Sequence, residues 1–267
     1  MRWIIGDIHG MARPLEALVK EIDRRDPDRQ LIFAGDYVNR GPDSKPVIDL
    51  LRTLSAARFV RGNHDDVFDQ VLHGDSFCAP RGRTGGDYDR IAQFKWFMNF
   101  GLFQTFRSYG ASEDELIRAD EVANIDLIDE LSAYVPKAHR DFLHELKPVV
   151  EENGFFVLHA KWEVDRPTES PPIFEQIAGS KKLRETIVWG RFSEDELAAE
   201  KVWGRRGYFG HTPVTYYTDT ARPIIGDKIV LVDTGAALPE GQRLTAFCHE
   251  NNEFIQADPS GRLLKSL

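Results

Sequence analysis

WIIGDIHG at residues 3–10 begins a pattern that returns as LIFAGD at 31–36 and FVRGNHD at 59–65. Each time, a short apolar run ends in glycine and polar side chains. Between these runs, apolar residues recur near the helical period at 15–22 and 47–54. Strands that alternate with helices of this length predict parallel strands joined by right-handed crossovers.

Ligands collect at the carboxyl ends of the strands in sheets of this kind. The polar side chains that follow the apolar runs are therefore expected to meet at one edge of the sheet. They are Asp7, His9, Asp36, Asn63 and His64, with His159 and His211 at the ends of later apolar runs. Singly, each has a plainer interpretation as a helix cap, a buried histidine or a turn residue. Together they form a mixed oxygen and nitrogen ligand set, which suits Mn, Fe or Zn better than Ca.

The middle of the chain, residues 67–148, has a different character. It carries helical patterns at 91–100 and 125–134, a glycine-rich loop at 82–86 and few strand signals. We interpret it as a helical excursion or cap within a single domain that spans residues 1–267. Arg81, Arg83 and Arg90 are candidates for shaping access to the site, although a solvated loop with incidental arginines is an equal alternative.

The second half of the chain turns to short β-type runs separated by turn residues. We expect this half to form a second sheet that packs on the first. The runs lie at 155–158, 208–209, 229–232 and 244–247.

Composition excludes several classes of protein. The 267 residues are 42% hydrophobic and 29% charged, with a formal net charge of −9. An acidic chain argues against a nucleic acid duplex as partner, because duplex binding needs clustered Lys and Arg. No apolar run approaches the roughly 20 residues that cross a bilayer, so no membrane partner is expected. The first residues lack a signal peptide pattern, and two distant cysteines fit a reducing compartment, which predicts a cytoplasmic protein.

The ordered motifs resemble those of the calcineurin-like metallophosphoesterases. They are GDIHG at 6–10, GDYVNRG at 35–41, RGNHD at 61–65, His159, GHT at 210–212 and DTG at 233–235. Within this family the chain resembles bacterial serine/threonine protein phosphatases of the phosphoprotein phosphatase branch, including segments 96–110 and 136–159. The resemblance implies an α/β fold, a four-layer sandwich of two mixed β-sheets flanked by helices, with a helical insertion.

The resemblance also implies a metal-dependent phosphoric ester hydrolase with two divalent ions, with manganese as first candidate and iron or zinc as alternatives. The implied ligands are Asp7 and His9 for one ion and Asn63, His159 and His211 for the other. Asp36 would bridge both ions. A hydroxide shared between them would attack phosphorus, because two positive charges lower the pKa of bound water.

Roles for further residues follow from the same resemblance. His64 would give a proton to the departing oxygen. Arg40 and Arg61 match positions that hold substrate phosphate, since guanidinium groups bind phosphate oxygens with paired bonds. Arg191 is a third candidate, with a surface salt bridge as the alternative. The turn at 233–235 is expected to be structural.

Asn39 departs from the family pattern, because most phosphoprotein phosphatases have Asp there. That carboxylate accepts a hydrogen bond from the general-acid histidine and stabilises its charge. The Asn carbonyl can accept the bond but carries no charge, so we expect a lower pKa for His64. This hinders cleavage of alkyl phosphates more than of anhydrides or aryl esters. Asp65 or Asp66 is an alternative source of the missing carboxylate.

Two substrate classes stay open. The first hypothesis is a phosphatase that hydrolyses phosphomonoesters, as phosphoprotein Ser/Thr phosphatases do. The alternative is a symmetrical diadenosine tetraphosphate hydrolase, because these relatives also lack Asp at the position of Asn39 and also have Asp at the position of Asp65. GHTP at 210–213 and SYG at 108–110 favour the phosphatase.

A third hypothesis, a non-catalytic metal-binding module, is less consistent with the intact ligand set. The expected partner is therefore a phosphorylated substrate: a phosphoprotein, a small phosphoester or a nucleotide polyphosphate.

Overall fold

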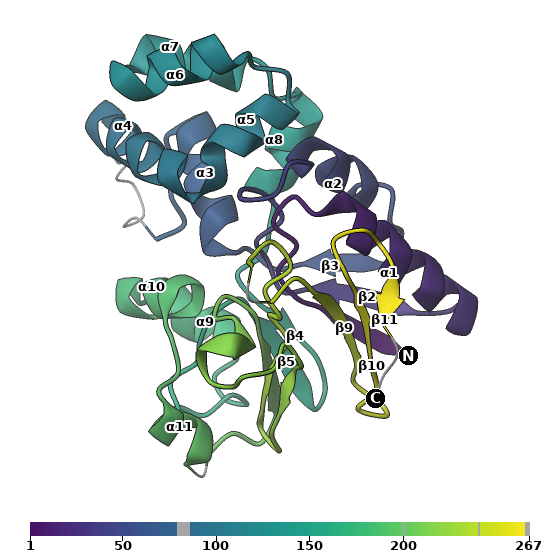
Figure 1. Ribbon diagram of the computed structural model, residues 1–267. Coiled ribbons are helices and arrows are strands. Elements are labelled where there is room, and N and C mark those ends of the chain that lie inside the picture. The colour runs from purple at the N-terminus through teal and green to yellow at the C-terminus, as the bar shows by residue number, and fades with distance from the viewer. Residues whose placement is uncertain (79–85, 200, 240, 265–267) are drawn as a thin grey trace.

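The computed structural model describes residues 1–78, 86–199, 201–239 and 241–264. Arg81, Arg83 and most of the glycine-rich loop lie outside these ranges. Two β-sheets face each other, and helices cover both outer faces (Figure 1). The predicted α/β four-layer sandwich with two mixed sheets is confirmed.

Each sheet contains three parallel strands together with antiparallel ones. In spatial order, the first sheet consists of β11 (Leu263–Leu264), β10 (Phe254–Ala257), β9 (Leu244–Cys248), β1 (Arg2–Ile5), β2 (Gln30–Phe33) and β3 (Ala57–Phe59). The second consists of β4 (Val150–Glu151), β5 (Phe155–Leu158), β6 (Arg206–Phe209), β8 (Ile229–Leu231) and β7 (Ile224–Ile225).

The central strands are apolar on both faces because both faces are buried. In β1, Ile4 packs between the two sheets, whereas Trp3 and Ile5 face the helices. In β5 the side chains alternate in the same way. Phe155 and Val157 pack between the sheets, whereas Phe156 and Leu158 face the helices of the second sheet. Each large apolar side chain buried in this way contributes about 1.5–3 kcal/mol.

Helices cover the two outer faces of the sheets, and the part of the chain between β3 and β4 forms a further group of helices (Figure 1). On the first sheet lie α1 (Ala12–Arg25) and α2 (Ser44–Leu51). On the second lie α9 (Ile173–Ala178) and α10 (Lys181–Trp189), followed by α11 (Glu194–Ala198) and η2 (Val214–Tyr216). Between β3 and β4 lie α3 (Asn63–His73), α4 (Gly86–Phe97), η1 (Met98–Leu102), α5 (Phe103–Ser108), α6 (Glu113–Glu121), α7 (Ile125–Ser132) and α8 (Lys137–His144).

The structure corrects two expectations about the second half of the chain. Residues 244–247 were expected in the second sheet, but β9 pairs antiparallel with β1 in the first sheet, with Ile4 opposite Phe247. Without β9, β1 would be an edge strand with unpaired backbone groups. The short helices α9, α10 and α11 also interrupt what was interpreted as a run of strands.

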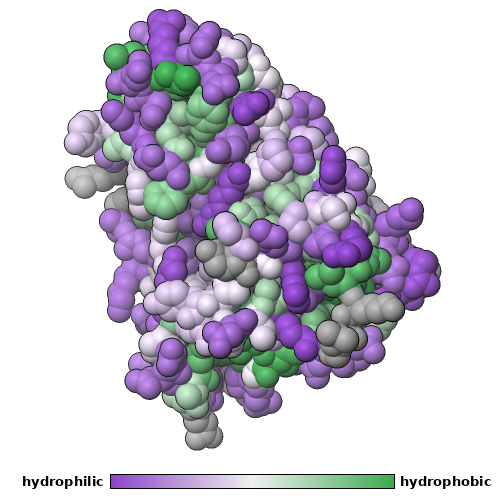
Figure 2. All heavy atoms as spheres, viewed as in Figure 1, coloured by the Kyte–Doolittle hydropathy of each residue, from purple (hydrophilic) through white to green (hydrophobic). Residues whose placement is uncertain are grey.

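Hydrophilic side chains predominate on the face shown in Figure 2, with small apolar areas between them. None of the described helices is long and apolar enough to span a membrane.

Candidate metal centre

The six predicted ligands are brought together at the carboxyl ends of the parallel strands of both sheets. Asp7 and His9 follow β1, Asp36 follows β2, and Asn63 follows β3 as the first residue of α3. His159 and His211 follow β5 and β6 of the second sheet. All of these side chains are buried. The site therefore lies where the two sheets present their strand ends to each other.

The carboxylate of Asp36 lies between two histidines. Its Oδ2 is 3.4 Å from Nε2 of His9, and its Oδ1 is 3.5 Å from Nε2 of His159. Two groups of potential ligands share Asp36: one includes His9 and the other includes His159 and His211. A single carboxylate is thus positioned to serve two adjacent cation sites.

Asn63, His159 and His211 converge on one point. Oδ1 of Asn63 lies 2.9 Å from Nε2 of His159 and 2.9 Å from Nδ1 of His211. His159 donates from Nδ1 to the carbonyl oxygen of Ala34 at 2.8 Å, which leaves Nε2 unprotonated. Two hydrogen-bond acceptors, Nε2 of His159 and Oδ1 of Asn63, therefore face each other. A cation between such atoms removes the repulsion, so this donor set fits a metal ion.

Near Asp36, two buried carboxylate oxygens lack partners. Among the described residues, Oδ1 of Asp7 and Oδ2 of Asp233 have no hydrogen-bond donor. Oδ2 of Asp7 accepts the backbone N–H of His211 at 2.9 Å. A side chain at Gly210 would collide with Oδ1 of Asp7, so glycine permits this close approach. Unpaired buried oxygens of this kind fit a divalent cation.

Burial determines the charge state of the ligands. It lowers the pKa of His9 and His211 well below the usual value and that of His159 to about 4, so the rings are neutral and can donate lone pairs. Burial also raises the pKa of Asp36 to about 7. Burial and the neighbouring carboxylate of Asp233 raise the pKa of Asp7 well above its usual range. These carboxylates lack the positive charge that a bound cation supplies.

The backbone at the site is held in an unusual conformation. His9, Asp36, Asn39, Arg40 and His211 all have positive φ, between 47° and 71°. Residues other than glycine adopt this region at a cost of about 1 kcal/mol or more each. Such a concentration of left-handed residues is typical of functional sites, where the fold maintains geometry that local preference does not.

The orientation of Asn39 differs from the expected one. The hydroxyl of Thr105 donates to Oδ1 of Asn39 at 2.7 Å, so the amide nitrogen of Asn39 faces Nδ1 of His64 at 3.0 Å. We expected the carbonyl to accept a bond from His64. The amide nitrogen can only donate, so this contact fits a ring whose Nδ1 is unprotonated, while Nε2 faces Nη2 of Arg40 at 3.4 Å. Burial, with the charge of Arg40, lowers the pKa of His64 well below its usual value.

Neither alternative carboxylate reaches His64. Asp65 accepts the backbone N–H groups of Asp36, Tyr37 and Gly62 at 2.8–3.0 Å and so shapes the loop that carries Asp36. Asp66 instead pairs with Arg61 at 3.2 Å.

Arg61 was expected to bind substrate phosphate, and the structure places it elsewhere. Its guanidinium is only 4% exposed and pairs with Asp66 and with Asp69, the latter at 2.8 Å. It also donates to the carbonyl oxygens of Leu143 and His144. A group committed to two carboxylates and two carbonyls is not available to a ligand. Arg61 joins α3 to the end of α8.

Of the other candidate arginines, Arg40 and Arg191 have side chains near the ligand histidines, whereas Arg90 is in an ion pair elsewhere. Arg40 is only partly buried, and its Nη1 lies 2.7 Å from Nε2 of His9, inside the site. Arg191 is exposed, with its guanidinium 5.8 Å from the centre of the Tyr216 ring. Arg90, by contrast, pairs with Asp129 at 2.7 Å and joins helices of the excursion.

Two features of the site were not recognised from the sequence. Asp233, interpreted as structural, contributes a buried carboxylate beside Asp7. An aromatic surface also borders the histidines: the ring of Trp189 lies 6.4 Å from His211, and Trp96 stacks on Trp189 at 5.8 Å. Trp96 is 49% exposed although it lies in α4. The position of Trp96 away from the apolar face of its helix is the sequence feature that could have indicated this surface.

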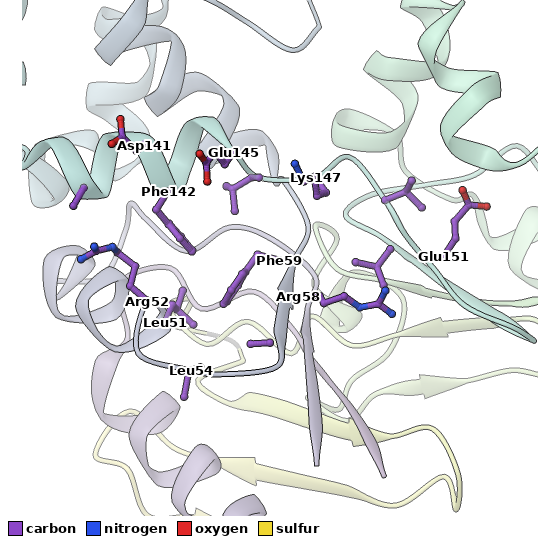
Figure 3. A pocket seen from close by; sticks show the side chains of 15 residues that line it. Leu51, Arg52, Leu54, Arg58, Phe59, Asp141, Phe142, Glu145, Lys147 and Glu151 are labelled. Carbon is purple, nitrogen blue, oxygen red and sulfur yellow. The ribbon is translucent and has the colours of Figure 1, made fainter. Parts of the chain in front are cut away.

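A cavity of about 690 Å³ lies away from these residues, between α2, β3, α8 and β4. Figure 3 shows Phe59 and Phe142 within it, and their rings are 5.0 Å apart. None of the predicted site residues is among its lining residues.

Comparison with known proteins adds to this geometry. The sequence model of the family described as calcineurin-like phosphoesterase matches residues 2–190. A symmetrical bis(5'-nucleosyl)-tetraphosphatase from Coxiella burnetii is 44% identical over an alignment of 122 residues, and the match covers 41% of this chain and 39% of that protein. The match thus spans about two fifths of the relative's length. An asymmetrical bis(5'-nucleosyl)-tetraphosphatase, PrpE from Oceanobacillus iheyensis, is 23% identical over 94% of this chain and 90% of its own length.

Among solved structures, one titled "Crystal structure of a putative diadenosine tetraphosphatase" superposes with a TM-score of 0.57. It is 18% identical and covers 96% of this chain and 92% of its own. This likeness concerns the fold.

Proposed function

Because the chain belongs to the calcineurin-like phosphoesterase family, we propose that it is a phosphoric ester hydrolase and that its substrate is a phosphoanhydride, a dinucleoside polyphosphate such as diadenosine tetraphosphate. The observation that carries this proposal is the contact between Asn39 and His64. Among the residues that the structure describes, no carboxylate contacts Nδ1 of His64, and the amide nitrogen that does contact it does not stabilise a protonated ring. A nucleoside polyphosphate departs without needing a proton, whereas the alkoxide of phosphoserine needs one.

We assign two divalent ions to the centre, with manganese as the first candidate. Asp7 and His9 would hold one ion, Asn63, His159 and His211 the other, and Asp36 both. The facing acceptors of Asn63 and His159, and the unpaired oxygen of Asp7, support this assignment. Ions held there would lower the pKa of an attacking water and neutralise charge on phosphate.

Arg40 is the residue of this chain that we assign to substrate phosphate. Its guanidinium has the planar donor geometry that suits phosphate, and the residue is only partly buried beside His9. Arg191 is the second candidate, and its charge is close enough to influence His211. These two cations supply local positive charge on a chain whose net charge is −9. We leave Arg61 out of this assignment because its guanidinium pairs with Asp66 and Asp69.

The aromatic surface beside the centre supports a nucleotide rather than a phosphoprotein. Trp96 and Phe100 are 49% and 42% exposed, and Phe97 between them contacts the ring of His64 at 5.0 Å. Exposed aromatic rings bind nucleobases by stacking, at about 1–3 kcal/mol per base. These rings come from α4 and η1, so we propose that residues 67–148 act as a cap on the centre within one domain.

The names of two relatives agree with this substrate class but differ in the bond that is cleaved. The deciding experiment compares turnover of diadenosine tetraphosphate, p-nitrophenyl phosphate and a phosphoserine peptide by the manganese-loaded protein. We expect kcat/KM for the tetraphosphate to exceed that for the peptide by at least about tenfold. Chromatography of the products then distinguishes two ADP from ATP plus AMP.

Faster turnover of the peptide would overturn the substrate assignment in favour of a phosphoprotein phosphatase. Asp36→Asn serves as the control, because activity that survives loss of the shared carboxylate would not come from this centre.

A further inference from the structure

A second cluster of potential metal ligands lies outside the centre described above. Nδ1 of His73 is 2.7 Å from Oδ1 of Asp69, one turn earlier in α3. Nδ1 of His144, at the end of α8, lies 3.3 Å and 3.2 Å from the two oxygens of Asp69. The two histidine rings are 5.1 Å apart. One ligand atom from each residue lies within 4.8 Å of the others.

We propose that Asp69, His73 and His144 form a binding site for a single zinc ion, separate from the catalytic centre. One carboxylate and two neutral imidazoles are the donors of many three-residue zinc sites, in which water completes the tetrahedron. Zinc bonds of about 2.0–2.1 Å place neighbouring ligand atoms about 3.3 Å apart. The contacts of His144 with Asp69 already have this spacing, and that of His73 needs to widen by a few tenths of an ångström.

Arg61 arranges two of the three ligands in advance. One of its nitrogens donates to Oδ2 of Asp69 at 2.8 Å, which fixes the carboxylate and leaves Oδ1 directed at His73. The other donates to the carbonyl oxygens of Leu143 and His144, at 3.0 and 2.8 Å. Outer partners that orient ligands in this way typically raise metal affinity about 10–100-fold. The buried position of Arg61 therefore supports the site.

Charge and access also suit a metal ion. Nδ1 of His73 and Nδ1 of His144 both face the carboxylate of Asp69, and zinc would take the place of the protons in these contacts. The side chain of His73 is 28% exposed and that of His144 is 54% exposed. Solvent thus reaches both histidines, so an ion can enter and water can bind.

The first test counts zinc. The full-length protein is kept in excess manganese, dialysed against Zn²⁺ and analysed for metal content, in parallel with a His73→Asn/His144→Asn variant. We expect the parent to retain one more equivalent of zinc than the variant and each single substitution to weaken zinc binding at least about tenfold. His249→Asn, which removes a histidine outside the cluster, should match the parent. Equal zinc content in parent and double variant would overturn the proposal.

The second test detects direct ligation by spectroscopy. In His144→Cys the new thiolate should bind Co²⁺ at the cluster and give a thiolate-to-cobalt charge-transfer band that the parent lacks. A folded His144→Cys protein, with the melting temperature of the parent but without this band, would show that the cluster is an ion-paired contact only. Neither test depends on hydrolysis, so the result is separate from that for the proposed substrate.

Discussion

The amide nitrogen of Asn39 lies 3.0 Å from Nδ1 of His64, and the hydroxyl of Thr105 holds the amide oxygen at 2.7 Å. All three side chains are buried. The contact places a neutral donor where a charged acceptor would stabilise an imidazolium. In the proposed reaction, the choice of leaving group would therefore depend on Thr105 of the helical excursion as well as on Asn39.

Asn39→Asp should favour substrates with poor leaving groups. A carboxylate at 39 accepts a bond from Nδ1–H and raises the pKa of His64, which burial now lowers. A step that needs the imidazolium operates below that pKa and is lost above it, so the alkaline limb of the pH profile should move to higher pH. We expect about a tenfold gain on a phosphoserine peptide and less than about threefold on diadenosine tetraphosphate. Equal gains on both substrates would argue against this coupling.

Thr105→Val should lower the free energy of unfolding although the two side chains have the same shape. Thr105 is fully buried, donates to Oδ1 of Asn39 and accepts the backbone N–H of Asn39 at 2.9 Å. Valine has the same shape but leaves buried polar groups of Asn39 with fewer partners, so we expect a loss of about 1–3 kcal/mol in the free energy of unfolding. Urea denaturation measures this. Thr105→Ser keeps the hydroxyl and should lose less; a serine variant as unstable as the valine one would point to packing instead.

Arg61 and Arg40 should respond differently to replacement by methionine. Arg61→Met leaves Asp66 and Asp69 buried without their cation, which costs about 3–5 kcal/mol in the free energy of unfolding. Arg40→Met should change that free energy by less than about 1 kcal/mol and raise KM for a phosphate substrate instead. Denaturation curves and steady-state kinetics of both variants separate the roles. A higher KM without destabilisation in Arg61→Met would restore its assignment to phosphate.

The layered fold could be predicted from sequence because its determinants are local. Each parallel strand is an apolar run followed by glycine and polar residues, so the position of Asp7, Asp36 and Asn63 after β1, β2 and β3 follows from strand direction alone. The structure also brings His159 and His211 to the same place. The pairing of β9 with β1 was not predictable, because it depends on which strand occupies a free edge far away in sequence.

The roles of Arg61 and Asn39 could not be predicted, since their partners lie far along the chain. Arg61 is bound by carbonyls more than 80 residues later, and the amide of Asn39 is oriented by a hydroxyl 66 residues later. A sequence motif identifies the side chain at a strand end. It does not predict which residues of the helical excursion that side chain contacts in the folded protein.

Asp7→Asn should raise the unfolding temperature relative to the parent in the absence of metal and lower it in the presence of metal. Without metal, Asp7 is a buried carboxylate beside Asp233 and within hydrogen-bond reach of it, and burial and this charge raise its pKa. An amide removes the repulsion, so the variant should unfold at a higher temperature than the parent in EDTA. With manganese, the parent gains stability that the variant largely lacks. Thermal melts in both buffers test this. If the parent is the more stable in EDTA as well, the unpaired oxygen of Asp7 is not a site of strain relieved by metal.

Trp96→Ala should weaken binding of nucleotides and leave other anhydrides unaffected. The ring is 49% exposed, is stacked at 17° on Trp189, and through Trp189 adjoins His211. Loss of one stacking partner for a base costs about 1 kcal/mol, or roughly a fivefold rise in KM for diadenosine tetraphosphate. Inorganic tripolyphosphate has no base, so its KM should not change. Tyr88→Ala removes another exposed aromatic side chain of α4 and should behave like the parent. A rise in KM for both substrates would mean that Trp96 supports the metal centre through Trp189 and does not contact the base.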